Sequence, residues 1–145
     1  MRGNSRNTGA RVFAWDGRPR AIRVLDTGQL SQSLSLINAT PIVGPDETIY
    51  AGSSNNHFFV FPVSGRSLAH QLGSIVDSAG CFVNASTLYF PCGDYSLYSL
   101  TPLPRGKATP HPLTNTVDSV STIDWFEGNV VADAANNLYA GCDNF

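Results

Sequence analysis

The stretch TIYAGSSNNHFFVF, residues 48–61, is written again further along the chain. TLYFPCGDYSLYSL occupies residues 87–100, and the shorter NLYAGCDNF occupies residues 137–145. When Ile49 is placed over Leu88, the following positions align without a gap at an offset of 39 residues. Because recurrence of a segment at a fixed period is the signature of a repeat architecture, we interpret the chain as an array of one small structural unit.

Each copy contains the same order of short segments. An apolar run comes first, at residues 40–44, 80–84 and 129–133. A turn containing Asp or Asn follows, since these residues bond their own backbone and tolerate left-handed conformations. Next come an Ile/Leu-Tyr strand, a second polar turn and an aromatic-rich strand. In HFFVF (57–61) and SLYSL (96–100) the alternation of side chains is that of a half-buried strand.

The fold class that we predict is all-β, with antiparallel four-stranded blades of an incomplete β-propeller. Residues 29–37 and 66–73 are short, serine-rich and without a capped helical face, so we expect fourth strands there rather than helices. Three or four strands in every ~40 residues are typical of propeller blades. A sandwich with Greek-key loops is the alternative, but it does not predict a gap-free offset.

The repeat predicts about three to four blades after a flexible N-terminus at residues 1–8. The expected boundaries of the blades are 9–38, 39–78, 79–119 and an incomplete 120–145. A blade buries its faces only against neighbouring blades, and 145 residues are too few to close a ring. We therefore expect a fragment of a longer product, or a chain whose open edges are covered by a partner.

The third copy starts later than the period predicts. Leu138 and Tyr139 repeat Leu88 and Tyr89 after 50 residues rather than 39, so an insertion separates the second and third copies. The proline-rich segment 100–116 is the expected place for this extra length.

Composition excludes several classes of protein. Hydrophobic content of 42% with 14% charged residues is typical of an ordered globular chain. No apolar run approaches the ~20 residues of a membrane span. The net charge of −2 does not favour nucleic acid as a partner, although six arginines gather near the N-terminus. These are Arg2, Arg6, Arg11, Arg18, Arg20 and Arg23. An exposed strand accounts for them more simply than a site for phosphate or an acidic partner.

A search for catalytic and metal-binding patterns predicts neither a catalytic residue nor a metal site. There is no GxSxG elbow and no glycine-rich phosphate loop. The three histidines, His57, His70 and His111, are not at ligand spacing from one another or from a cysteine. Four acidic residues fall in repeat turns, where turn formation explains them: Asp46, Asp94, Asp133 and Asp143.

Cysteines and aromatic residues are assigned to the core. Three cysteines without CxxC spacing, Cys81, Cys92 and Cys142, are interpreted as buried free thiols. A Cys81–Cys92 bridge is conceivable if the two lie on adjacent strands. Aromatic residues recur at fixed repeat positions and predict the packing between blades. They are Tyr50, Tyr89 and Tyr139, with Phe58, Phe59, Phe61, Tyr95 and Tyr98.

Three long segments carry a resemblance to a known family. They are PIVGPDETIYAGSSNNHFFVFPVSGRSLAHQL (41–72), VVADAANNLYAGCDNF (130–145) and VFAWDGRPRAIRVLDTGQLSQSL (12–34). A small-apolar strand, a turn and a hydrophobic-Tyr-x-Gly-Ser-x-Asp/Asn strand end resemble the quinoprotein-type, or PQQ-like, β-propeller family. The similarity covers about residues 11 to 145 and is carried by structural motifs.

The repeat and the missing catalytic patterns predict a non-catalytic propeller segment that serves as a protein-interaction scaffold, and the resemblance implies the same role, because many members of that family carry no quinone. Its partners would be another protein or further blades, and self-association through open edges would be possible. The alternative is a fragment of a PQQ-dependent alcohol or sugar dehydrogenase, with PQQ and calcium as cofactors. The outer-turn tryptophan of such enzymes is absent, with His70 near its place, and no residue here maps onto their cofactor or calcium ligands. The family also implies an extracytoplasmic location, either periplasmic or in a secretory lumen.

Overall fold

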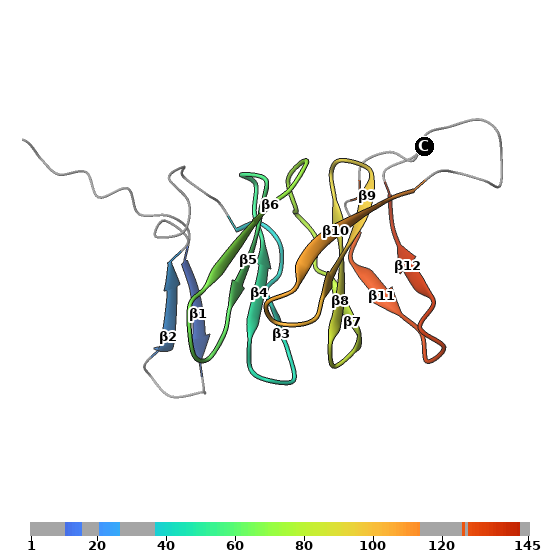
Figure 1. Ribbon diagram of the computed structural model, residues 1–145. Helices are drawn as coiled ribbons and strands as arrows, with labels where there is room; N and C mark the ends of the chain where they lie inside the picture. The colour runs from blue at the N-terminus through green and yellow to red at the C-terminus, as the bar shows by residue number, and fades with distance from the viewer. Residues whose placement is uncertain (1–10, 16–20, 27–36, 114–125, 127, 143–145) are drawn as a thin grey trace, which may run out of the picture.

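The protein is all-β in a computed structural model that describes residues 11–15, 21–26, 37–113, 126 and 128–142. The strands of these residues form two four-stranded antiparallel sheets and two hairpins. The sheets and hairpins stand side by side in chain order (Figure 1). No helix in the described ranges could cross a membrane.

The strands follow one another as simple meanders. The hairpin nearest the N-terminus contains β1 (Arg11–Trp15) and β2 (Ala21–Asp26). Sheet 1 contains β3 (Ile42–Val43), β4 (Ile49–Gly52), β5 (His57–Phe61) and β6 (Leu68–Gln71). Sheet 2 contains β7 (Cys81–Asn84), β8 (Thr87–Cys92), β9 (Ser96–Thr101) and β10 (Lys107–Pro112). The last hairpin contains β11 (Val130–Ala132) and β12 (Leu138–Ala140).

The two sheets share one strand register. Ile49 of β4 pairs with Phe61 of β5, and 39 residues later Leu88 of β8 pairs with Leu100 of β9. A slip of one residue would turn every side chain of a strand to the opposite face, so a shared register places equivalent residues on equivalent faces. The gap-free alignment of residues 48–61 with residues 87–100 is thereby confirmed in three dimensions.

The predicted fourth strand at residues 66–73 is confirmed as β6, whereas residues 29–36 lie outside the described part. The insertion between the second and third copies was expected in segment 100–116. This expectation is wrong for most of that segment. Its residues 107–112 form β10, and the long connection follows β10, because β11 starts only at residue 130. β10 is an edge strand of sheet 2. An edge strand tolerates prolines, because the N–H that proline lacks can face away from the neighbouring strand there.

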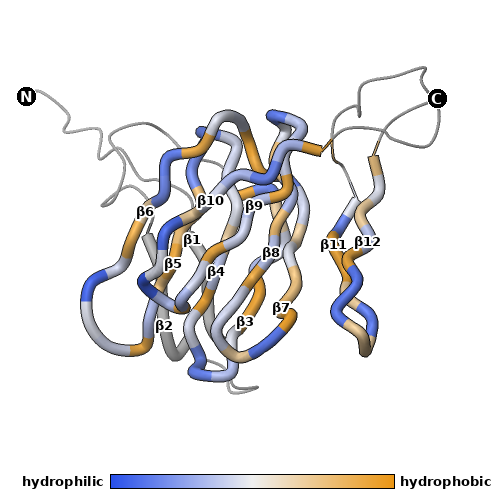
Figure 2. The backbone as a smooth tube through the Cα atoms, turned by 45° about the vertical axis from the view of Figure 1, so that its right-hand side comes forward, coloured by the Kyte–Doolittle hydropathy of each residue, from blue (hydrophilic) through white to orange (hydrophobic). Residues whose placement is uncertain are grey.

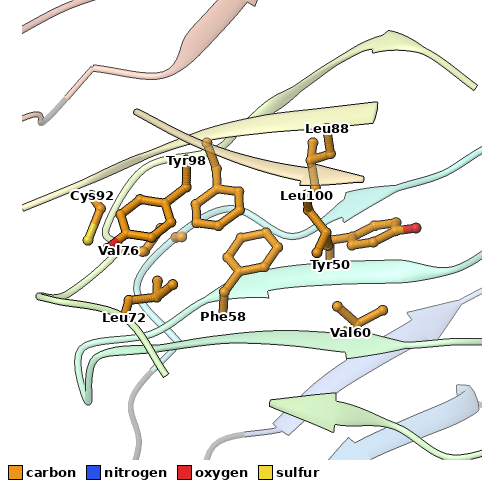
Figure 3. Close-up of a cluster of buried hydrophobic side chains, with 11 residues drawn as sticks. Tyr50, Phe58, Val60, Leu72, Val76, Leu88, Cys92, Tyr98 and Leu100 are labelled. Atoms are coloured by element: carbon orange, nitrogen blue, oxygen red, sulfur yellow. The ribbon is translucent and has the colours of Figure 1, made fainter. Parts of the chain in front are cut away.

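The main core lies between sheet 1 and sheet 2 (Figure 3). At its centre the rings of Phe58 and Phe90 stack with centroids 3.8 Å apart and planes 3° apart. Tyr98 extends this stack, with its ring centroid 5.6 Å from that of Phe90. The residues of this core are Ala39, Tyr50, Phe58, Val60, Leu72, Val76, Leu88, Phe90, Cys92, Tyr98 and Leu100.

Sheet 1 is apolar on its other face as well. Ile49, Ala51, Phe59 and Phe61 form a second buried cluster, from positions that alternate with those of the main core along β4 and β5. Both faces of a sheet are apolar when both are covered by neighbours. Burial of Tyr50, Phe58, Phe59, Phe61 and Tyr98 confirms their assignment to the core.

The core assignment of Tyr95 is wrong. This side chain is 48% exposed, because the residue lies in the β8–β9 turn with a φ of 64°. Asn56 holds the equivalent position of sheet 1 with a φ of 62°. Asparagine commonly adopts this left-handed conformation, so the turn geometry, and not the aromatic side chain, determines where Tyr95 lies.

The connection between the sheets is attached to the end of β4. The Val76 amide donates a hydrogen bond of 3.1 Å to the carbonyl of Ser53. A Cβ added to Gly52 would lie 2.3 Å from Cγ1 of Val76, so only glycine permits this approach. The buried Val76 side chain thereby enters the main core from the connection itself.

Aspartates close the first turn of sheet 1 and the turn of hairpin β11–β12. Asp46 accepts hydrogen bonds from the Thr48 amide at 3.1 Å and the Thr48 hydroxyl at 2.8 Å. Asp133 accepts bonds from the amides of Ala135 and Asn137, at 2.8 and 2.9 Å. The role of these aspartates as turn formers is confirmed.

Truncation of Phe58 tests the contact between the sheets. We expect Phe58→Ala to lower the free energy of unfolding by ~3–5 kcal/mol, since it leaves a cavity against Phe90. Urea unfolding followed by fluorescence measures this change. Val63→Ala is the control, because Val63 is an exposed residue beyond β5, and we expect a change within ~0.5 kcal/mol. Equal effects of the two substitutions would show that the stacked rings do not stabilise the protein.

The Asp133 carboxylate gives a pH prediction. Hydrogen bonds from Asn137 lower its pKa below the ordinary value of 3.8. The hairpin is therefore stabilised above pH ~4, and this stabilisation is lost as the pH falls through the lowered pKa. Titration of the Asp133 side-chain carbon by NMR should show this lowered midpoint, and Asp133→Asn should remove the acid dependence of the hairpin. A midpoint above 3.8 would contradict the hydrogen-bonded turn.

Candidate interaction surface

The histidines do not form a site. His57 lies in β5, where its Nδ1 is 2.8 Å from the Asn55 carbonyl oxygen and its ring stacks on Phe59. His70 and His111 hold matching positions on the fourth strands of their sheets, opposite Phe58 and Leu97. Burial lowers the pKa of His70, whereas the His111 side chain is exposed. The three rings therefore belong to different strands and do not converge on a ligand.

The acidic candidates are separated in the same way. Asp46, Asp94 and Asp133 lie in three different turns, and Asp143 lies outside the described residues. The Asp94 carboxylate accepts hydrogen bonds from the Tyr98 hydroxyl at 2.7 Å and from the Ser96 amide at 3.2 Å. Across the described ranges, no three His, Cys, Asp or Glu residues come together in a group that could hold a metal ion.

The cysteines are free thiols in different environments. Cys81 and Cys92 lie on the adjacent strands β7 and β8, but Cys81 is opposite Tyr89 and Cys92 is opposite Ser96. Because they are not opposite each other, the conceivable bridge is not formed. Burial raises the pKa of Cys92 to about 11, which favours the thiol form. The assignment to the interior is confirmed for Cys92 and wrong for the exposed Cys142.

Sequence reasoning missed one contact between chemically active side chains. Ser99 Oγ lies 2.8 Å from His111 Nε2, and the His111 ring centroid lies 6.0 Å from that of Tyr89. Ser99 and His111 are twelve residues apart on neighbouring strands, so only the register of β9 with β10 brings them together. A nucleophilic serine also needs a group that orients the base, and no described residue bonds the other ring nitrogen of His111.

Only two of the six N-terminal arginines lie in the part of the chain that the structure describes. Arg11 lies in β1 and Arg23 in β2, and the other four lie outside the described residues. These two backbone positions do not support a site for phosphate or an acidic partner.

Hairpin β11–β12 carries an exposed pair of apolar residues. Val131 pairs with Tyr139 across this hairpin, as Ile42 pairs with Tyr50 in sheet 1. Tyr50 is 1% exposed and meets Phe82 of sheet 2 edge to face, with centroids 5.7 Å apart. Val131 and Tyr139 are 55% and 57% exposed. The same pair of positions is therefore covered in sheet 1 and open in the hairpin.

We name Val131 and Tyr139 the docking face. Figure 2 shows hairpin β11–β12 with hydrophobic colour along β11. The assignment of Tyr139 to a buried core is wrong for this chain, because no described element covers the outer face of the hairpin. Tyr89, at the equivalent position of β8, is only partly buried. The Tyr139 hydroxyl donates a hydrogen bond of 3.1 Å to Asp133, which restricts the exposed ring.

The opposite face of the hairpin is packed on sheet 2. The Val130 amide donates to the Ala79 carbonyl at 3.0 Å, and the Ala79 amide donates to Asn129 Oδ1 at 2.8 Å. Val130 and Phe126 are buried. The hairpin is thus attached through one face and leaves the docking face open.

Comparison with known proteins adds no assignment. No protein-family model matches the sequence, and a search of curated proteins finds no significant match. The features that bear on function are therefore the geometry of the docking face and the repeated register of the sheets.

Proposed function

We propose that the sheets are blades of a β-propeller and that the protein is a non-catalytic scaffold for protein interactions. Successive meanders of four strands with a common register support the blade interpretation. The bond between Val130 and Ala79 joins the beginnings of neighbouring units, as expected for innermost strands around an axis. A sandwich has two facing sheets, whereas sheet 2 has neighbours on both faces, sheet 1 and hairpin β11–β12.

One observation carries the scaffold function: the docking face repeats a pair of positions that the protein itself covers elsewhere. Over Tyr50 the covering element is the next sheet, which contributes Phe82. A partner that covers Tyr139 would meet a surface of the same shape and chemistry. We infer that this partner is a protein presenting a β-sheet with an apolar face.

Energetics set the size of this interface. Full burial of a large apolar side chain contributes ~1.5–3 kcal/mol, so Val131 and Tyr139 together supply the centre of an interface rather than the whole of it. A stable complex usually buries ~1,200–2,000 Å² in total. The partner must therefore extend beyond the two residues, along the strands and turns of the hairpin.

Site-specific crosslinking tests the proposal. A photoreactive phenylalanine placed at position 139 should crosslink to a protein partner in cells, because the docking face is covered in the complex. The same amino acid at position 95 is the matched control, since Tyr95 is exposed to a similar extent, 48% against 57%. Val131→Asp should abolish the adduct at position 139, because it places a charge in an apolar contact.

The crosslink must be specific to support the scaffold function. Adducts that are equal at positions 139 and 95, or that persist in Val131→Asp, would contradict it. Circular dichroism of the variant checks that the strands remain formed. Val131 is exposed, so this substitution should change the free energy of unfolding by no more than ~0.5 kcal/mol.

A further inference from the structure

All the Lys and Arg side chains whose surroundings the structure describes lie on two turns. Arg66 belongs to the turn between β5 and β6, Arg105 belongs to the turn between β9 and β10, and Lys107 is the first residue of β10. All three are exposed, and the other six Lys and Arg residues of the chain precede residue 24. We call residues 62–67 and 102–107 the basic turns. They contain no Asp or Glu, so three positive charges lie there without a compensating carboxylate in either segment.

The basic turns lie next to each other in space. Both are at the lower end of the sheets in Figure 1, where they join equivalent pairs of strands. A Cβ added to Gly65 would lie 2.5 Å from Nη2 of Arg105, so the guanidinium of the second turn lies against the backbone of the first. Gly65 has a φ of 89°, and glycine permits both this angle and this approach. Arg105 therefore reaches from sheet 2 to sheet 1 and lies beside the residue that precedes Arg66.

The three cations have no partner among the described residues. Within the ranges that the structure covers, no hydrogen bond or ion pair involves Arg66, Arg105 or Lys107. The acidic residues nearest to them in sheet 1, Asp46 and Glu47, belong to the turn before β4. A guanidinium presents several N–H donors, and two parallel ones match the oxygens of a carboxylate. The basic turns therefore offer donors for carboxylates of another molecule.

The turn that carries Arg105 is fixed to the body of the protein. The Leu103 amide donates a hydrogen bond of 3.0 Å to the Ser86 carbonyl in the β7–β8 turn. The Leu103 side chain packs against the main core. Binding costs less conformational entropy when the recognising group is already held in place. The backbone that presents Arg105 is therefore arranged before a ligand arrives.

An exposed apolar residue lies in the same surface. Val63 is three residues before Arg66 in the β5–β6 turn, and its side chain is 55% exposed. Single exposed apolar residues are ordinary on a protein surface. Here, however, every charge in the turn is positive, so the valine is an apolar contact point beside unpaired cations. A matching ligand would carry an apolar side chain among carboxylates.

A nucleic acid matches the basic turns less well than an acidic segment of a protein. Proteins that bind single strands provide aromatic rings for stacking, and the basic turns contain no aromatic residue. A protein that binds a duplex commonly neutralises about six to ten phosphates. The basic turns hold three cations, and the net charge of the chain is −2. A short acidic peptide segment requires only two or three cations, which this surface supplies.

We propose that the basic turns bind an acidic segment of a partner protein, with carboxylates on Arg66 and Arg105 and an apolar side chain against Val63. Lys107 adds a third positive charge, which acts as a point charge without a fixed hydrogen-bond geometry. The basic turns share no residue with the docking face. This inference therefore goes beyond the proposed scaffold function, names a second surface, and is tested separately.

The probe is the synthetic peptide acetyl-Glu-Glu-Leu-Glu-Glu-amide, and its control peptide has Gln in place of every Glu. At low ionic strength the acidic peptide should shift the NMR signals of the Nε–H groups of Arg66 and Arg105. It should also bind at least about tenfold more tightly than the control peptide. Added salt should weaken only the acidic peptide, because salt screens exposed charges. Equal binding of the two peptides would overturn the proposal.

Two double variants of equal net charge separate a site from general attraction. Arg66→Gln with Arg105→Gln should weaken the acidic peptide about tenfold, from about two- to fivefold for each exposed ion pair. Both residues are exposed, so the urea midpoint of unfolding should not change. Arg2→Gln with Arg6→Gln removes the same charge outside the basic turns and should weaken binding less than about twofold. Equal losses in the two variants would refute the site.

Val63→Ala tests the apolar contact. A peptide with Ser in place of Leu should bind about threefold more weakly to the natural protein, because it buries less apolar area. In Val63→Ala this difference should disappear, since the methyl groups that meet the leucine are missing. A difference between the two peptides that persists in Val63→Ala would refute the role of Val63.

The remaining outcomes identify other partners and separate the two surfaces. If an oligothymidylate with the same number of charges binds the basic turns more tightly than the acidic peptide, the proposed partner is wrong. A specific crosslink at position 139 without peptide binding would overturn this inference and leave the scaffold function intact. Peptide binding that depends on Arg66 and Arg105, without that crosslink, would support the basic turns and contradict the docking face.

Discussion

The contact on which the rest of the structure depends is the stack of Phe58 on Phe90 between the two sheets. Both faces of sheet 1 carry buried apolar residues, so a single sheet of this sequence has no polar face to turn to water. Sheet 1 therefore has to lie between two neighbours. Stability is distributed over the contacts between neighbouring sheets and hairpins, and their order in the chain is also their order in space.

In this arrangement, the position of a residue rather than its type determines its burial. Tyr50 and Tyr139 are equivalent in sequence and in strand pairing, yet the first is buried under Phe82 and the second is exposed. Burial raises the pKa of the Tyr50 hydroxyl to about 12, and among the described residues it makes no hydrogen bond of standard geometry. Tyr139 bonds Asp133 instead. The apolar packing of the Tyr50 ring thus outweighs the loss of that hydroxyl bond.

The repeat period allowed the register of both sheets to be predicted, because the gap-free alignment of Ile49 with Leu88 leaves no room for a slipped strand. It failed where a neighbour or a backbone angle decides the outcome. Tyr95 lies in a turn that needs a positive φ, which no period reveals. Ser99 and His111 meet only through the pairing of β9 with β10. The repeat does not predict this pairing, because the offset between β6 and β10 differs from the offset between β5 and β9. The sequence also cannot show that, among the described elements, none covers Tyr139.

The exposed pair Val131–Tyr139 is best understood from its buried counterpart in sheet 1. Tyr50 is covered because Phe82 of the next sheet meets its ring edge to face. None of the described elements meets Tyr139 in this way, although Tyr139 and Tyr50 hold the same position in their strands. Burial of apolar area is the main source of free energy when such faces associate. The contact that holds sheet 1 against sheet 2 therefore shows which chemistry would cover Val131 and Tyr139: an apolar face with an aromatic ring at its centre.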